Sequence, residues 1–182
     1  AFADVSGLSR DRLVELCHLV SRRVLRHTGI QVSIGVACTK TLAKVANRMA
    51  KRRQELAGVC IGTEPLSFSR VLEQMDTGDV WGIGIKISGK LAELGITSAR
   101  QLRDSEPEWI KKRFSVVLMR TVLELQGESC LDLEELEESR KSLMCGRSFG
   151  TPLKELEDIR PALTHFVQNA ATRLWKYKQA AS

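Results

Sequence analysis

The sequence predicts an α+β protein in which a small βαβ-like part is followed by an all-helical block and then by a further strand and helix. Apolar residues alternate over residues 31–37 as in a strand, and they recur at helical spacing on both sides of it. The glycine-interrupted segments from Pro65 to Gly127 are typical of short helices. With 182 residues, 43% hydrophobic and 27% charged, the chain suits two or three small globular units.

The first elements are predicted from caps and periodicity. Ser9 is a suitable N-cap for a helix over residues 10–27, and Gly29 ends it. In the strand at 31–37 the valines and isoleucine fall on one face, and Ser33 and Gly35 fall on the other. If residues 2–5 form a first strand, the order in this part becomes βαβαβ.

The remaining helices and strands are predicted from the same signals, which are caps and the spacing of apolar residues. Thr39 can cap a second helix that runs to about Gln54, and a short strand over residues 59–61 follows. After the helical block, an acidic segment at 131–140 is expected to be a linker. A strand-like segment at 143–149 and a final helix at about 158–178 complete the chain.

The positive charge is unevenly distributed. The net charge is +6, and no acidic residue lies between Glu15 and Glu55. In the second helix, basic residues recur every four positions and no acid on that helix offsets their repulsion; they are Lys40, Lys44, Arg48 and Arg52. The helix dipole disfavours cations in the first turns, so Lys40 and Lys44 suggest a bound anion such as a triphosphate. An ordinary solvated basic face is the alternative.

Residues 82–95 have the pattern of a helix-hairpin-helix motif, with Gly82-Ile83-Gly84 at its start. The glycines allow a tight hairpin whose backbone N–H groups can face a DNA phosphate without reading a base. Lys86 and Lys90, one turn apart, add charge on the same side. A dinucleotide-binding loop is excluded because Ile87 replaces the third glycine. An ordinary turn between helices is the remaining alternative.

Candidate catalytic and metal-binding residues are nearly absent from the sequence. The five cysteines include no C-x-x-C pair, which argues against a zinc site and fits a reducing, cytoplasmic compartment. Asp4 is the one acid near the first expected strand, and a single carboxylate is too little to hold two metal ions. No apolar run approaches the roughly 18 residues of a membrane span, so no membrane partner is expected.

Together these segments resemble the Y-family translesion DNA polymerases, most closely the UmuC-like ImpB/MucB/SamB branch, which acts in SOS mutagenesis. The resemblance runs through nearly the whole chain. The segments that carry it are Val32–Asn47, Val80–Gly84, Leu94–Ile96, Arg113–Gly127 and Cys145–Gly150.

The resemblance implies a partial polymerase palm at 1–64, a helical thumb with the hairpin at 65–127, an acidic linker at 128–141 and the start of a little finger at 142–182. Ala1-Phe2 match the residues after the S-x-D-E motif of the family. The catalytic carboxylates and their magnesium ions are therefore expected upstream of Ala1. This segment alone is expected to bind the DNA backbone without catalysing nucleotidyl transfer.

The resemblance also implies residue roles and partners. Lys44 matches the lysine that contacts the incoming triphosphate of the dNTP, with Lys40 beside it. Gly82, Ile83 and Gly84 would hold a phosphate of the primer–template. Arg147 and Ser148 match the strand that follows the template backbone. A UmuD-like subunit and a recombinase filament are implied partners. A non-enzymatic helix-hairpin-helix DNA-binding adaptor is the alternative.

Overall fold

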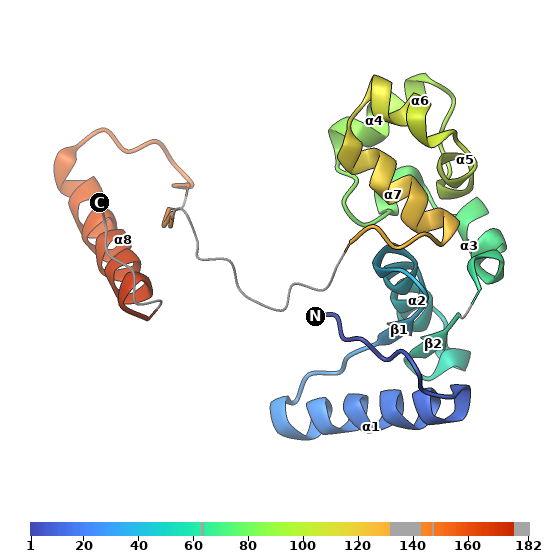
Figure 1. The fold of residues 1–182 in the computed structure, drawn as a ribbon. Helices are drawn as coiled ribbons and strands as arrows, with labels where there is room; N and C mark the ends of the chain where they lie inside the picture. The colour runs from blue at the N-terminus through green and yellow to red at the C-terminus, as the bar shows by residue number, and fades with distance from the viewer. Residues whose placement is uncertain (63, 132–142, 147, 177–182) are drawn as a thin grey trace. The chain divides into compact units, whose positions relative to one another are not determined.

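The computed structural model describes residues 1–62, 64–131, 143–146 and 148–176, and these fall into two compact units. Unit 1 spans Ala1–Leu133 and unit 2 spans Glu134–Ser182. Figure 1 follows the chain through both units by colour from the N-terminus to the C-terminus. The predicted linker at 128–141 lies largely outside the described residues. Each unit is considered by itself below.

The first helix forms where its caps predict it. Helix α1 spans Arg10–Thr28; the Ser9 side chain accepts a hydrogen bond from the N–H of Arg12, and Gly29 ends the helix with a φ of 71°. Positive φ is favourable for glycine because it has no Cβ. Leu13 and Cys17 are buried, so one face of α1 packs against the protein. The predicted helix and both of its ends are confirmed.

The strand–helix–strand unit that follows also forms. Strands β1 (Ile34–Val36) and β2 (Val59–Ile61) pair in parallel, as strands joined by a crossover helix do. Helix α2 (Lys40–Arg52) makes that crossover and begins at Thr39, whose side chain accepts from the N–H of Leu42. The two strands lie between α1 and α2 (Figure 1). Both predicted strands are thus present, although β1 is shorter than expected.

Two other expected strands are wrong. Residues 2–5 are not a strand, so the order is βαβ rather than βαβαβ, and none of the described residues in 143–149 is in a strand. An extended segment becomes a strand only when its backbone groups pair with a neighbour, and β1 pairs with β2.

A mostly apolar pocket of about 480 Å³ lies between the N-terminal segment, α1 and β1.

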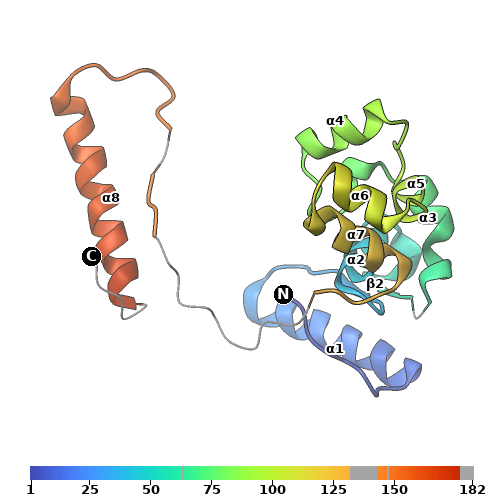
Figure 2. The ribbon, with the colours of Figure 1, turned by 45° about the horizontal axis from the view of Figure 1, so that its top comes forward.

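The rest of unit 1 is helical, as the glycine-interrupted sequence predicts. Short helices follow one another and gather into one block, visible in Figure 2. The helices of this block are η2 (Pro65–Phe68), α3 (Ser69–Glu73), η3 (Thr77–Asp79), α4 (Ile85–Glu93), α5 (Ala99–Arg103), α6 (Pro107–Arg113) and α7 (Val116–Gln126), whereas the short helix η1 (Gln54–Leu56) lies between α2 and β2 in the chain.

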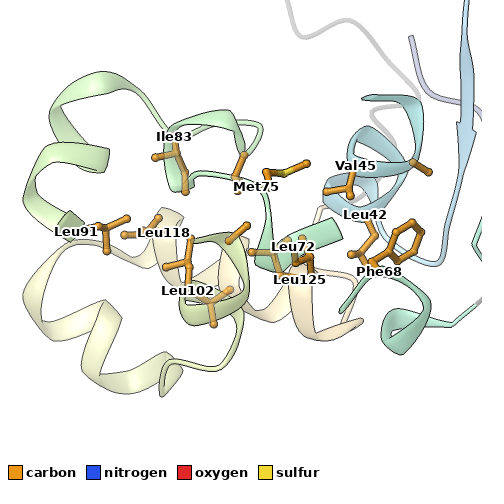
Figure 3. Close-up of a cluster of buried hydrophobic side chains, with 14 of the residues drawn as sticks. Leu42, Val45, Phe68, Leu72, Met75, Ile83, Leu91, Leu102, Leu118 and Leu125 are labelled. Atoms are coloured by element: carbon orange, nitrogen blue, oxygen red, sulfur yellow. The ribbon is translucent and has the colours of Figure 1, made fainter. Parts of the chain in front are cut away.

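One hydrophobic core runs through unit 1 and joins α2 to the helical block. Leu42 and Val45 of α2 belong to the same buried cluster as Phe68, Leu72 and Leu125 from the helices (Figure 3). Burying a side chain of this size contributes about 1.5–3 kcal/mol. The core is therefore continuous across residue 64, where the sequence predicts a palm–thumb boundary, and that division stays a prediction.

The described part of unit 2 is dominated by helix α8 (Leu156–Lys176), which contains Pro161. The helix begins earlier than the predicted start near residue 158. None of its described residues is buried, and its apolar residues Leu163 and Val167 are exposed. Across the described residues of both units, no helix is long and apolar enough to cross a membrane.

Candidate nucleic-acid interface

The two lysines predicted to bind a triphosphate lie against aromatic rings. The Nζ atom of Lys44 is 4.8 Å from the centroid of the Phe2 ring and 5.9 Å from that of Trp81. The Nζ atom of Lys40 is 5.4 Å from the Phe2 centroid. These distances are within the range at which a ring face attracts a cation. The rings therefore hold both ammonium groups on one side of α2.

Phe2 and Trp81 join three segments that are far apart in the sequence. Their ring centroids are 5.4 Å apart and the rings are tilted by 56°. Phe2 belongs to the N-terminal segment, and Trp81 directly precedes Gly82 of the hairpin. The structure thus brings the lysines of α2 next to the start of the hairpin. Sequence reasoning missed both rings, because a lone aromatic residue gives no signal of its long-range partner.

A third basic residue of α2 is neutralised from another segment. Arg48 forms an ion pair with Asp79 of η3, and both side chains are about one-third exposed. The sequence shows no acid on α2 itself, but the fold supplies one from outside the helix. The apparent excess charge of the stripe is therefore smaller than the sequence indicates. The ion pair also fixes η3, three residues before Gly82, against α2.

The hairpin has the backbone that its glycines predict. Gly82 has a φ of +88°, and Gly84, with a φ of −87°, is the N-cap residue of α4. The N–H groups of Ile87 and Ser88 donate to the carbonyl of Gly84, at 3.0 Å in each case. The first N–H groups of a helix have no acceptor within that helix. The N–H groups of Ile85 and Lys86 are therefore at the open N-terminal end of α4.

Of the hairpin residues predicted to contact DNA, Ile83 is buried and the others are exposed. Ile83 is only 6% exposed, and its N–H donates to Val80, so it anchors the hairpin in the core. Ile85 is 93% exposed, which leaves the helix start accessible. Lys86 and Lys90 are exposed on α4. The hairpin amides and these two lysines can therefore reach a phosphate, whereas the side chain of Ile83 cannot.

The last two predicted DNA contacts belong to unit 2. Arg147 lies outside the described residues, and Ser148 is exposed in a segment without helix or strand. The structure does not place either of them relative to the lysines and hairpin of unit 1.

The start of α2 carries an internal anion that the sequence does not reveal. Glu124 of α7 is fully buried, and its Oε2 atom accepts from the N–H of Thr41 at 2.8 Å. Its carboxylate occupies the helix end where the dipole favours negative charge. The dipole argument for an external anion at Lys40 and Lys44 is therefore weaker than the sequence suggested. Their binding role stays a prediction.

Metal ligands do not gather in the described part of the chain. Asp4 is exposed, and its Oδ1 atom accepts from the N–H of Ser6 at 2.8 Å. The hydrogen bonds from Ser6 lower the pKa of this carboxyl below its ordinary value. Among the described residues no three His, Cys, Asp or Glu side chains are grouped so that they could hold a metal ion. The described residues therefore do not fit a two-metal centre.

The negative charge of Glu124 affects the pKa of a nearby thiol, Cys38, so the position of this charge can be tested. Cys38 is exposed at the surface, but partial desolvation of its sulfur raises the pKa of the thiol, and the negative charge of Glu124 raises it less strongly. Because the thiolate is the nucleophile, Cys38 should react slowly with iodoacetamide near neutral pH.

We expect Glu124→Gln to lower the pKa of Cys38 and to speed its alkylation at a fixed pH, measured by mass spectrometry of the Cys38 peptide. Cys17 is the internal control, because burial alone raises the pKa of that thiol. An unchanged Cys38 rate would contradict the proximity of the Glu124 charge. A rise at both cysteines would indicate loosening of the fold.

Comparison with known proteins gives a consistent result. The model of the impB/mucB/samB family matches residues 1–48, and that of the impB/mucB/samB family C-terminal domain matches residues 140–182. Protein UmuC of Salmonella typhimurium is 39% identical over 176 residues, which cover 96% of this chain and 42% of UmuC. DNA polymerase IV of Brucella melitensis is 29% identical over 177 residues, 96% of this chain and 38% of the polymerase.

Among solved structures, a chimera of the Y-family DNA polymerase Dbh matches with a TM-score of 0.61 and 25% identity, over 90% of this chain and 46% of the chimera. The chain therefore spans less than half the length of the relatives that it matches.

Proposed function

We propose that this chain, which belongs to the impB/mucB/samB family, is the phosphate-binding part of a Y-family DNA polymerase that copies damaged templates. The reaction of the whole protein is template-directed nucleotidyl transfer. Two magnesium ions held by carboxylates are part of this proposal by family resemblance, and the described residues here contain no group that could hold them. This segment contributes contacts to the DNA backbone and to the triphosphate.

One observation carries the proposal: Lys44 of α2 lies beside Trp81, the residue directly before the hairpin. The Trp81 ring contacts Lys44 and directly precedes Gly82, and the Arg48–Asp79 ion pair ties the same loop to α2. Lys44 and the start of the hairpin, which we propose to contact phosphates and which are about forty residues apart in sequence, are thus close together in unit 1. A polymerase needs this adjacency, because the incoming nucleotide binds next to the primer terminus.

The chemistry of this surface suits a damaged template. Backbone amides of the hairpin and the ammonium groups of Lys86 and Lys90 recognise phosphates and not base edges. Contacts to phosphates survive when a base is altered. We assign residues 1–64 to the palm, 65–127 to the thumb and the segment with Arg147 and Ser148 to the little finger.

The adaptor interpretation explains less of the chain. A DNA-binding adaptor would account for the hairpin at 82–95 but not for the family matches at 1–48 and 140–182. The cytoplasmic location, the UmuD-like subunit and the recombinase filament remain part of the polymerase proposal. The two partners rest on the family resemblance alone, and the location rests on the cysteine pattern.

The decisive experiment is primer extension by the full-length gene product on a defined primer–template. Template-directed addition of nucleotides, dependent on magnesium, is the expected result. Binding of the same DNA without any extension, under conditions in which a control polymerase is active, would favour the adaptor.

DNA binding should depend on salt but not on sequence. For two to three phosphate contacts, affinity should fall roughly 10- to 40-fold between 50 and 200 mM salt. Fluorescence anisotropy with two duplexes of unrelated sequence measures both properties. A salt-independent affinity, or a strong preference for one duplex, would contradict a backbone-contacting interface.

The hairpin can be tested without unfolding it, because a Cβ at Gly84 would meet no atom within 4 Å and its φ is −87°. Gly84→Val should leave the fold intact and weaken duplex binding roughly tenfold, since the side chain keeps a phosphate from the amides of α4. Gly89→Val on the same helix, also in open space, is the matched control. Equal affinities of the two variants would reject the hairpin as a contact.

A further inference from the structure

Glu124 is an unusual residue in the part of the chain that the structure describes. It is 0% exposed, and the other buried polar side chains there are threonines. Acidic residues are almost never fully buried unless their charge is compensated. The proposed phosphate contacts do not use Glu124, so its burial needs a separate explanation.

The compensation comes from backbone groups of two other segments. Oε2 accepts from the N–H of Thr41 at 2.8 Å, and Oε1 accepts from the N–H of Cys130 at 2.9 Å. The backbone carbonyl of Glu124 also accepts from the hydroxyl of Thr39 at 2.8 Å. One residue of α7 thus holds the N-cap and first turn of α2 together with the segment that follows α7.

The geometry of α2 gives this junction a functional consequence. Lys40 lies between the two threonines that bond to Glu124, and Lys44 is one turn farther along the same helix. Loss of the carboxylate would leave the buried N–H of Thr41 and the partly buried N–H of Cys130 without an acceptor, and leaving the buried one unpaired costs more than a hydrogen bond gains. The first turn of α2 would shift or take up water, and both lysines would move from their places over Phe2.

The negative charge of Glu124 acts in the same direction. Two lysines in the first turns of a helix are opposed by its dipole, and a carboxylate at the helix N-terminus offsets that opposition. A neutral side chain of the same size would therefore not replace Glu124.

We infer that Glu124 is a positioning residue that sets the affinity for the nucleotide triphosphate by fixing Lys40 and Lys44 relative to the hairpin. This inference rests on the proposed function. Glu124 itself contacts neither the nucleotide nor DNA, because it is fully buried.

The test measures nucleotide KM, kcat and duplex affinity in the full-length gene product with Glu124→Gln, Glu124→Asp and Val122→Ala. Gln keeps the volume of Glu but loses the charge, and its NH2 group would face one of the two N–H donors. Asp keeps the charge but is one methylene too short to reach both. Val122 is buried on the same helix and is the control for lost stability.

Glu124→Gln should raise KM roughly 10- to 100-fold, as small misplacements of a binding group do, with duplex affinity within about twofold. Glu124→Asp should raise KM by less, and Val122→Ala should lower Tm without changing KM. If Glu124→Gln does not fold, folded Glu124→Asp carries the test. An unchanged KM in the folded variant, or an equal rise in Val122→Ala, would overturn the inference.

Lys44→Ala in the same assay separates this inference from the function on which it rests. A rise in KM for Lys44→Ala but not for the Glu124 variants would reject the positioning role alone. A wild-type protein without nucleotide addition, or a Lys44→Ala variant with unchanged KM, would reject the proposed function and the inference with it.

Discussion

Gly35→Ala should unfold or severely destabilise unit 1. A Cβ atom at Gly35 would lie 2.1 Å from the backbone N of Asn47 and 2.3 Å from the backbone O of Ala43. Both atoms belong to the backbone of α2, so no side-chain rotation relieves the clash. Strand β1 would have to move away from α2, which would disturb the pairing with β2 and the helix that carries the lysines.

The expected cost exceeds that of ordinary overpacking, which is typically 1–3 kcal/mol. We expect a loss of at least about 3 kcal/mol, or a fall in Tm on the order of 10 °C. Thermal unfolding followed by circular dichroism measures it. Gly89→Ala is the matched control, because Gly89 is in open space on α4, where alanine should be neutral or stabilise by about 0.5–1 kcal/mol. A Gly35→Ala protein with the Tm of the wild type would show that β1 and α2 are not in contact.

Gly35 belongs to a strand that could be predicted from the sequence, as could the starts of the first two helices. The alternation over 31–37 places Gly35 opposite the apolar face of the strand, and the caps at Ser9 and Thr39 mark the helix starts. Each of these signals is local, because it depends on residues within a few positions of one another. The first two helices and the two short strands were predictable for that reason.

The remaining features of the site depend on residues that are far apart in the sequence. The ring contact between Phe2 and Trp81, the Arg48–Asp79 ion pair and the burial of Glu124 all require the tertiary fold. A charge count along α2 cannot detect an acid supplied by another helix. The basic stripe of the sequence therefore overstated the unopposed charge of α2, and the binding role of this helix stays a prediction.

The expected strand at residues 2–5 failed for a related reason. Its apolar residues fit a strand pattern, but β pairing needs a neighbour with unpaired backbone groups, and pattern alone does not supply one. In the structure Phe2 instead places its ring over Lys40 and Lys44. An apolar residue that sequence reasoning assigned to a sheet thus belongs to the candidate binding surface.

Lys44→Ala should have the largest effect on catalysis by the full-length gene product. A hydrogen bond to a charged group contributes about 1.5–3 kcal/mol, and each 1.4 kcal/mol corresponds to a tenfold change in binding. The half-buried ammonium of Lys44 is screened less than one at the open surface. We therefore expect KM for nucleotides to rise at least about tenfold, with a smaller change in kcat if the contact forms before the chemical step.

The control for Lys44→Ala is available on the same helix. Lys51 is exposed in the last turn of α2, seven residues farther along, or roughly 10 Å at the helical rise. Lys51→Ala removes the same charge from the same helix and should change KM by less than about twofold. Lys44→Gln should resemble Lys44→Ala, because it keeps a polar group but loses the cation.

If Lys51→Ala raises KM as much as Lys44→Ala, the effect comes from the net charge of α2 and not from a contact at Lys44. A difference between them would support a phosphate contact at the end of α2 that lies beside Phe2, Trp81 and the hairpin.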